Sequence, residues 1–150
     1  MKLRRAELHD APALVERWAE MFAEIGAAPA DAAVRRGFAG YLARKLPAED
    51  FAAWVVVESD RVLATASLIL YEIPGRPEVT CEGYVINVYT VPSARGRGLG
   101  RKLMEALLAH ARTLPLRKLW LRTAPRAEAL YGRLGFAARP ELMELDLSRS

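Results

Sequence analysis

A short segment of the chain, from Arg95 to Arg101, interleaves three glycines with three arginines. It follows an apolar run that ends at Pro92, and it leads into a helical pattern that begins at Leu99. Backbone N–H groups that no side chain shields, at the positive end of a helix dipole, bind phosphate oxygens. Arginine side chains also pair with phosphate. The segment therefore predicts a phosphate-binding loop; a glycine-rich turn with solvated arginines is the alternative interpretation.

The glycine spacing excludes the two commonest nucleotide-binding loops. A Walker loop needs Gly-x-x-x-x-Gly-Lys followed by Ser or Thr, and the chain has no such run. The dinucleotide fingerprint needs a third glycine three residues after the second, whereas here Gly98 is followed by Gly100 and Arg101. The spacing instead resembles the pyrophosphate loop of the GNAT N-acetyltransferases, Gln/Arg-x-x-Gly-x-Gly/Ala. Arg95, Gly98 and Gly100 stand at its defined positions.

The elements that must position this loop follow from the hydrophobic periodicity of the chain. We expect helices over 10–25, 31–46, 99–114 and 126–134, and strands over 2–6, 53–58, 61–71, 83–91, 117–122 and 142–147. Ser59 and Asp60 are turn residues that predict a hairpin. Because helices separate some strands and hairpins join others, we predict an α/β (α+β) fold with a mixed central sheet and helices packed on its faces.

Length and composition agree with one globular domain over residues 1–150. The chain is 52% hydrophobic and 27% charged, which is ordinary for a soluble protein. No apolar run approaches the ~20 residues needed to span a bilayer, so no membrane partner is expected. Cys81 is alone and no signal peptide is evident, which favours a cytoplasmic location.

The predicted order, β-α-α-β-β-β-α-β-α-β, is that of the GNAT fold, and two further motifs strengthen the resemblance. Residues 87–92, Asn-Val-Tyr-Thr-Val-Pro, are similar to the strand end that precedes the family's cofactor loop. Residues 130–136, Leu-Tyr-Gly-Arg-Leu-Gly-Phe, are similar to its Leu-Tyr-x-x-Leu-Gly-Phe helix end. The resemblance is specific over about 84–136 and rests on element order before that.

The resemblance implies that the chain binds acetyl-CoA as cosubstrate and that an amine attacks the thioester directly in a ternary complex. It also implies a strand that splays from its neighbour before the loop, so that free backbone groups pair with the pantetheine arm. The residues placed along pantetheine are Val88, Tyr89, Thr90 and Val91. The backbone N–H groups placed at the pyrophosphate belong to Arg95, Gly96, Arg97, Gly98, Leu99, Gly100 and Arg101.

Two residues are candidates for the chemistry. Tyr131 lies where many family members have a tyrosine that gives a proton or hydrogen bond to the departing thiolate; a core aromatic is the alternative. The histone-acetylating branch has a general-base glutamate where this chain has Tyr84. Glu82, two residues earlier and on the same face of an extended strand, is the candidate base, with a water chain or a merely exposed loop acid as alternatives. Ala124 replaces a cofactor-binding asparagine, so Thr123 or another residue must supply that contact.

Two classes of function stay open at this point. The leading one is an enzyme that acetylates a primary amine on a small molecule or a protein. The alternative is a non-catalytic GNAT-like module that binds acyl-CoA. The basic segment 95–139 raises nucleic-acid binding as a third option, but no stacking pattern accompanies its arginines, so no nucleic acid is expected. His9 and His110 are too scattered to predict a metal site. The resemblance is also compatible with a homodimer.

Overall fold

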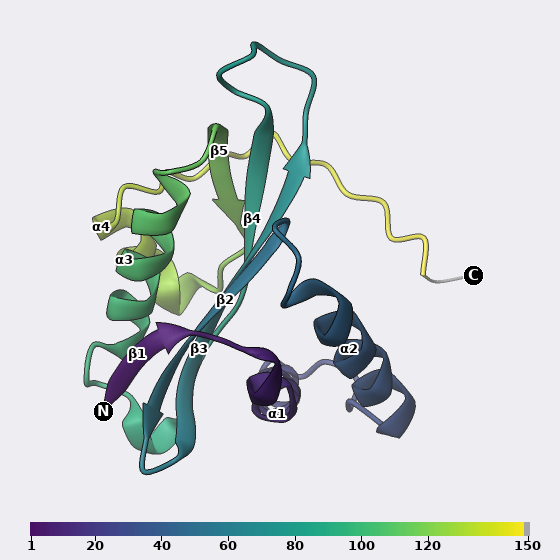
Figure 1. The fold of residues 1–150 in the computed structure, drawn as a ribbon, viewed down its shortest axis with the longest axis vertical. Coiled ribbons are helices and arrows are strands. Elements are labelled where there is room, and N and C mark those ends of the chain that lie inside the picture. The colour runs from purple at the N-terminus through teal and green to yellow at the C-terminus, as the bar shows by residue number, and fades with distance from the viewer. Residues whose placement is uncertain (149–150) are drawn as a thin grey trace.

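Five strands form one sheet in the computed structural model, which describes residues 1–148 (Figure 1). They lie in the order β1-β2-β3-β4-β5, where the first four are antiparallel and β5 is parallel to β4. The mixed sheet predicted from the sequence is therefore confirmed. The strands are β1 (Lys2–Arg5), β2 (Phe51–Glu58), β3 (Arg61–Glu72), β4 (Cys81–Thr90) and β5 (Leu116–Leu121).

Helices cover both faces of the sheet (Figure 1). On one face lie α1 (Ala11–Glu24) and α2 (Ala32–Lys45), and on the other lie α3 (Leu99–Ala111) and the short α4 (Glu128–Arg133). Single 3₁₀ turns precede three of these helices: η1 (Leu8–Asp10), η2 (Pro92–Ala94) and η3 (Pro125–Ala127). None of the helices within 1–148 is long and apolar enough to cross a membrane.

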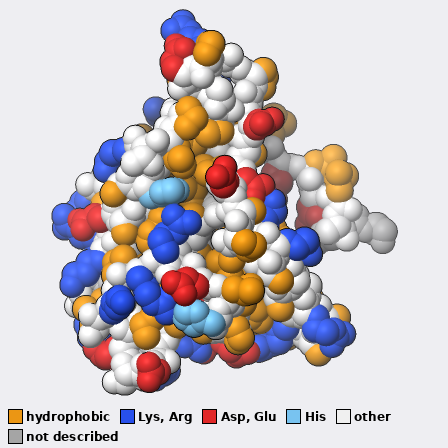
Figure 2. Space-filling view, viewed as in Figure 1, with side chains coloured by type: hydrophobic (Ala, Val, Ile, Leu, Met, Phe, Trp, Pro, Cys, Tyr) orange, Lys and Arg blue, Asp and Glu red, His pale blue; other side chains and the backbone are white. Residues whose placement is uncertain are grey.

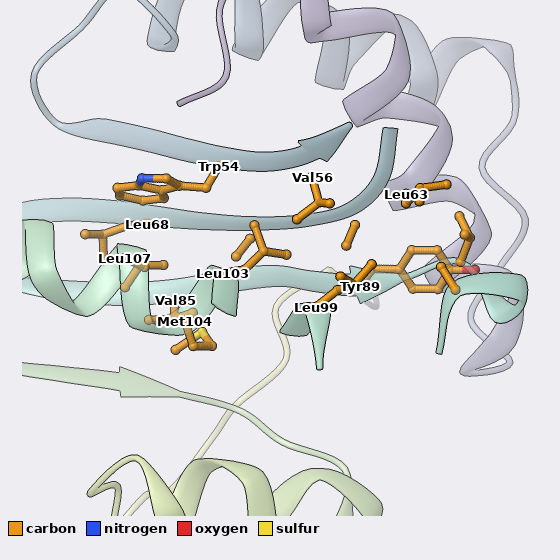
Figure 3. Close-up of a cluster of buried hydrophobic side chains, with 14 of the residues drawn as sticks. Trp54, Val56, Leu63, Leu68, Val85, Tyr89, Leu99, Leu103, Met104 and Leu107 are labelled. Atoms are coloured by element: carbon orange, nitrogen blue, oxygen red, sulfur yellow. The ribbon is translucent and has the colours of Figure 1, made fainter. Parts of the chain in front are cut away.

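The core divides into two clusters, and β2 contributes to both. Successive strand side chains point to opposite faces, so Trp54 and Val56 pack with α3 residues such as Leu103 (Figure 3). Phe51 and Val55 pack in the second cluster against α1 and α2. This arrangement explains why the strand is apolar without alternation: both of its faces are buried.

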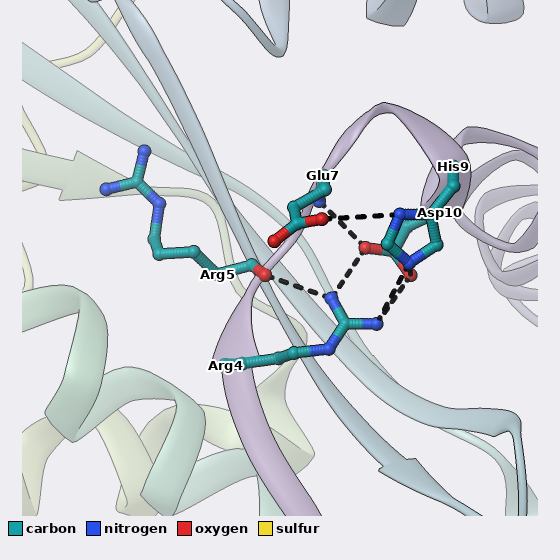
Figure 4. Close-up of polar contacts among 5 residues, drawn as sticks. All are labelled: Arg4, Arg5, Glu7, His9 and Asp10. Atoms are coloured by element: carbon teal, nitrogen blue, oxygen red, sulfur yellow. Dashed lines mark hydrogen bonds and ion pairs between the residues drawn. The ribbon is translucent and has the colours of Figure 1, made fainter.

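An ion pair fastens the start of α1 to the first strand. Arg4 donates to both carboxylate oxygens of Asp10, at 2.7 and 3.0 Å, and the Glu7 N–H donates to Asp10 at 2.7 Å (Figure 4). Burial alone would raise the pKa of Asp10, but the hydrogen bonds from Arg4 and from the Glu7 N–H, together with the charge of Arg4, outweigh it and the pKa is lowered. The helix begins where the sequence predicts, yet this carboxylate caps η1 instead of α1.

The hairpin prediction is confirmed, whereas the predicted last strand is wrong. Ser59 and Asp60 have φ angles of 49° and 60°, the left-handed geometry of a tight hairpin turn. Residues 142–147 form no strand. Met143, Leu145 and Leu147 have the expected alternation but are 94%, 81% and 84% exposed. A strand needs a neighbour for its backbone hydrogen bonds, and within 1–148 none runs beside this segment.

Candidate functional site

The strand β4 separates from β5 halfway along its length. Its pairing with β5 ends at Val85, opposite Leu121, while its pairing with β3 continues to Thr90. A β-bulge falls just beyond the separation, where Asn87 has a φ of 55° and its carbonyl accepts a hydrogen bond from Thr65 Oγ1 at 3.0 Å. The remainder of β4 therefore faces the gap with unpaired backbone groups, which is the splay expected from the sequence.

The glycine loop closes one end of this gap and leads into α3. A cavity of about 340 Å³ lies beside it, bounded by loop residues and by α4. Of the hydrogen bonds outside regular elements in the described chain, none is donated by the backbone N–H groups of residues 96–101. Gly98 precedes α3 with a φ of 73°, and a Cβ there would meet no atom within 4 Å. The loop thus presents open N–H groups at a helix start, as an anion requires.

Each arginine side chain of the loop forms an ion pair with a glutamate of this chain. Arg95 donates to Glu24 at 2.6 and 2.7 Å, Arg97 to Glu58 at 2.9 Å, and Arg101 to Glu105 at 2.9 Å. These pairs are exposed, so each contributes little stability and a phosphate can compete for the arginine. Backbone N–H groups are therefore the anion donors that this arrangement leaves available.

Glu24, the last residue of α1, contacts the loop and its surroundings, and the sequence did not predict these contacts. Besides Arg95, its carboxylate lies 3.4 Å from the Tyr89 hydroxyl and 3.7 Å from Arg126 Nη2. It therefore joins α1, β4, the loop and the turn before α4. The partners are up to 102 residues away along the chain (126 − 24), and no local pattern signals such a pairing.

Tyr131 lies in α4, next to the cavity wall formed by Leu130 and Arg133. Its ring is buried and meets Phe136 edge to face at 5.9 Å. Burial raises the pKa of the phenol. Within 1–148 the one buried polar side-chain atom without a partner is Arg17 Nε, so the hydroxyl of Tyr131 is not sealed in the core. The neighbours Leu130 and Arg133, which line the cavity, were missed from the sequence although they share its helix.

Glu82 is a buried strand residue, 4% exposed, within the part of β4 that is still paired with β5. It accepts hydrogen bonds from Tyr71, at 3.0 Å, and from Arg117. Lys118 lies 3.9 Å away. Burial raises its pKa, but the hydrogen bonds and positive charges outweigh this, so the pKa of Glu82 is lowered. A general base needs the opposite shift, and these contacts disfavour the predicted role.

The replaced asparagine has no obvious substitute in the same turn. Ala124 is exposed, and the hydroxyl of Thr123 donates to the carbonyl of Ala124 at 3.0 Å.

An aromatic pair lies where β4 and β5 are still paired: Tyr84 of β4 stacks on Trp120 of β5 with ring centroids 3.9 Å apart. The indole N–H of Trp120 donates to the Tyr71 hydroxyl at 2.8 Å. The aromatic pair and Glu82 therefore belong to one connected network on the paired strands.

Comparisons with known proteins agree with this fold. Residues 13–136 match the Acetyltransferase (GNAT) family, and the chain belongs to that family. A predicted acetyltransferase with acetyl-CoA from Clostridium acetobutylicum superimposes with a TM-score of 0.88 at 24% identity, covering 99% of this chain and 97% of that one. A GCN5-related N-acetyltransferase from Ralstonia eutropha gives 0.81 at 26% identity, covering 97% of each chain.

One curated relative extends the comparison to sequence. Glucosamine 6-phosphate N-acetyltransferase of Trypanosoma brucei brucei is 32% identical over 91 residues. The match covers 58% of this chain and 58% of that protein, so the likeness reaches little more than half of the relative's length.

Proposed function

We propose that this protein is an acetyl-CoA-dependent N-acetyltransferase that acetylates a primary amine of a small molecule or a protein. The observation that carries the proposal is the cavity beside the glycine loop. Open backbone N–H groups of the loop bound it on one side, and the helix that carries Tyr131 bounds it on the other. One wall thus suits phosphates, and the other belongs to the helix that carries Tyr131, the candidate acid.

The backbone of this chain would bind most of the cosubstrate. The N–H groups of residues 96–101 would bind the pyrophosphate, because glycines at 96, 98 and 100 let the oxygens approach the main chain, whereas the Arg95 N–H already donates to the Pro92 carbonyl. The unpaired backbone edge of Val88–Val91 would pair with the amides of the pantetheine arm, much as an added strand would. Acetyl-CoA supplies an activated thioester whose acetyl group the amine can take up directly.

Tyr131 would stabilise the sulfur as the carbon–sulfur bond breaks. Its raised pKa keeps the phenol protonated at neutral pH, so it can donate a hydrogen bond or its proton to the thiolate. The attacking nitrogen must also lose a proton. Because Glu82 is held by Arg117 and Tyr71, we assign this proton to water in the gap between β4 and β5 in preference to Glu82.

The acceptor class rests on the relative named above, which acts on an amino sugar phosphate. We therefore place glucosamine 6-phosphate first in a panel of amines that also contains polyamines and peptides with a free terminus. The alternative function, a module that binds acyl-CoA without turnover, shares the loop but has no use for the Tyr131 hydroxyl.

Release of free thiol from acetyl-CoA, measured with each amine in the panel, tests the proposal. We expect thiol release that requires both the protein and one of the amines. Calorimetry with acetyl-CoA alone separates the two functions: tight binding, with no thiol released beyond the no-amine control for any acceptor, would support the binding module instead. Absence of acetyl-CoA binding would overturn both.

A further inference from the structure

Glu24 connects the two sides of the cavity beside the glycine loop. Arg95 lines this cavity on the loop side, and Arg126 belongs to η3, the turn before α4, which lines the other side. The Glu24 carboxylate accepts from Arg95 Nη2 at 2.6 and 2.7 Å and lies 3.7 Å from Arg126 Nη2. One carboxylate at the end of α1 therefore contacts an arginine from each side of the cavity.

The cavity itself is positively charged. Its charged lining residues are Arg95, Arg101 and Arg133, and no carboxylate of residues 1–148 lines it. Lys and Arg side chains also gather over α3, which the loop leads into, on the face that Figure 2 shows. The Glu24 side chain is 27% exposed, so solvent reaches the ion pair, and its single charge cannot neutralise two arginines. A pyrophosphate carries more charge and more acceptor oxygens, so it can take both arginines from the carboxylate.

Arg95 stays beside the cavity without the help of Glu24. Its Nε donates to the Thr90 carbonyl at 3.0 Å, and its guanidinium lies 5.6 Å from the centre of the Tyr89 ring. Both partners belong to β4, so they hold the arginine against the end of the strand. Loss of the Glu24 charge should therefore free Arg95 for a phosphate and leave its side chain in place.

We propose that Glu24 competes with the phosphates of the cosubstrate for Arg95 and Arg126, and that it thereby lowers the affinity for acetyl-CoA and for CoA alike. This inference rests on the proposed function, because CoA is the product of that reaction and carries the same phosphates as acetyl-CoA. When CoA leaves, the carboxylate takes the arginines back and offsets part of the cost of breaking their contacts with phosphate. Glu24 thus acts through two arginines to favour product release, a step that limits the turnover of many enzymes.

Calorimetry with CoA, which carries the phosphates but no thioester, tests this inference. Glu24→Gln should bind CoA about 3- to 10-fold more tightly, the range of one or two exposed ion pairs. Glu58→Gln is the matched control, because it removes the same charge from the partner of Arg97, a loop arginine that does not line the cavity. Its affinity should stay within about twofold of wild type, since salt screens exposed charges at a distance. In an Arg95→Gln background, the gain from Glu24→Gln should be smaller.

The direction of the change separates competition from bracing. If Glu24 only braced the site, Glu24→Gln would bind CoA more weakly, and that result would overturn the inference. An unchanged affinity, or an equal gain in Glu58→Gln, would overturn it as well; circular dichroism checks that each variant is folded. A wild-type protein that binds neither CoA nor acetyl-CoA would overturn the proposed function and this inference with it. Normal wild-type binding without a gain in Glu24→Gln overturns this inference alone.

Discussion

The glycine loop and the network around Glu82 are both polar, but the polar groups of the network have hydrogen-bond partners within the protein, whereas most backbone N–H groups of the loop do not. The loop leaves the backbone N–H groups of residues 96–101 without protein acceptors. Around Glu82, by contrast, Tyr71, Arg117 and Trp120 bond to one another or to the carboxylate. Residues 95–98 are exposed, so their open donors can exchange water for an anion, and their position at a helix start beside a cavity favours a phosphate ligand. A saturated network indicates structure.

This difference also predicts what a substitution changes in each region: ligand binding in the loop and folding stability around Glu82. Removing a donor from an open loop weakens the ligand complex and leaves the folded protein nearly unchanged. Removing Glu82 takes away a buried acceptor that Tyr71 and Arg117 share, which costs folding stability. The three substitutions below test whether the contrast holds, starting with the one expected to have the largest effect.

Tyr131→Phe should lower kcat by roughly 10²- to 10⁴-fold, the range of a positioned acid. The ring and its contact with Phe136 remain, so packing is preserved. Affinity for acetyl-CoA should change little, because the hydroxyl acts as the carbon–sulfur bond breaks. Steady-state kinetics with an acceptor for which chemistry is rate-limiting, together with calorimetry for acetyl-CoA, measure the two quantities.

Tyr41→Phe is the matched control for this substitution. Tyr41 is also partly buried, its pKa is also raised by burial, and it packs edge to face on Phe51. It lies in the other core cluster, away from the cavity. Equal turnover in both variants and wild type would mean that Tyr131 is a packing residue and that water or backbone groups stabilise the thiolate.

The loop could be predicted because the residues that form it are neighbours in the sequence. Glycines, a strand end and a helix start lie within one short segment, and their order along the chain fixes their arrangement in space. The surroundings of Glu82 could not be predicted, because Arg117 is 35 residues away and reaches it only once β5 lies beside β4. Glu24 and Arg95 are 71 residues apart. The alternation at 142–147 predicts a strand that does not form, because a strand also needs a neighbouring edge and no local sequence pattern supplies one.

Gly98→Val should weaken acetyl-CoA binding by about 10- to 100-fold, the loss of one or more hydrogen bonds to a charged group. A side chain at this left-handed position strains the backbone and keeps phosphate oxygens away from the main chain. Gly26→Val is a matched control: Gly26 has a φ of 72° and equally open surroundings, so it carries the same strain outside the loop. Calorimetry should show unchanged affinity in the control, and equal losses in both variants would argue against the phosphate site.

Glu82→Gln should have the smallest effect on turnover, with kcat staying within about tenfold of wild type, below the contribution of a general base. Its effect should appear in stability instead. The pKa of Glu82 is lowered in the folded protein, so its ionised form stabilises the fold above the unfolded pKa of about 4.3, and this contribution disappears as the pH falls through the lowered value.

The difference in Tm between wild type and Glu82→Gln should therefore be largest at neutral pH and shrink as the solution is acidified below about pH 4. Glu105→Gln, which removes an exposed partner of Arg101, should barely change Tm at either pH. A fall in kcat of more than about 100-fold, with the acidic limb of the pH–rate profile lost, would restore Glu82 as the base. The network of Tyr71 and Arg117 would then have to open during the reaction, and the contrast between the two regions would fail.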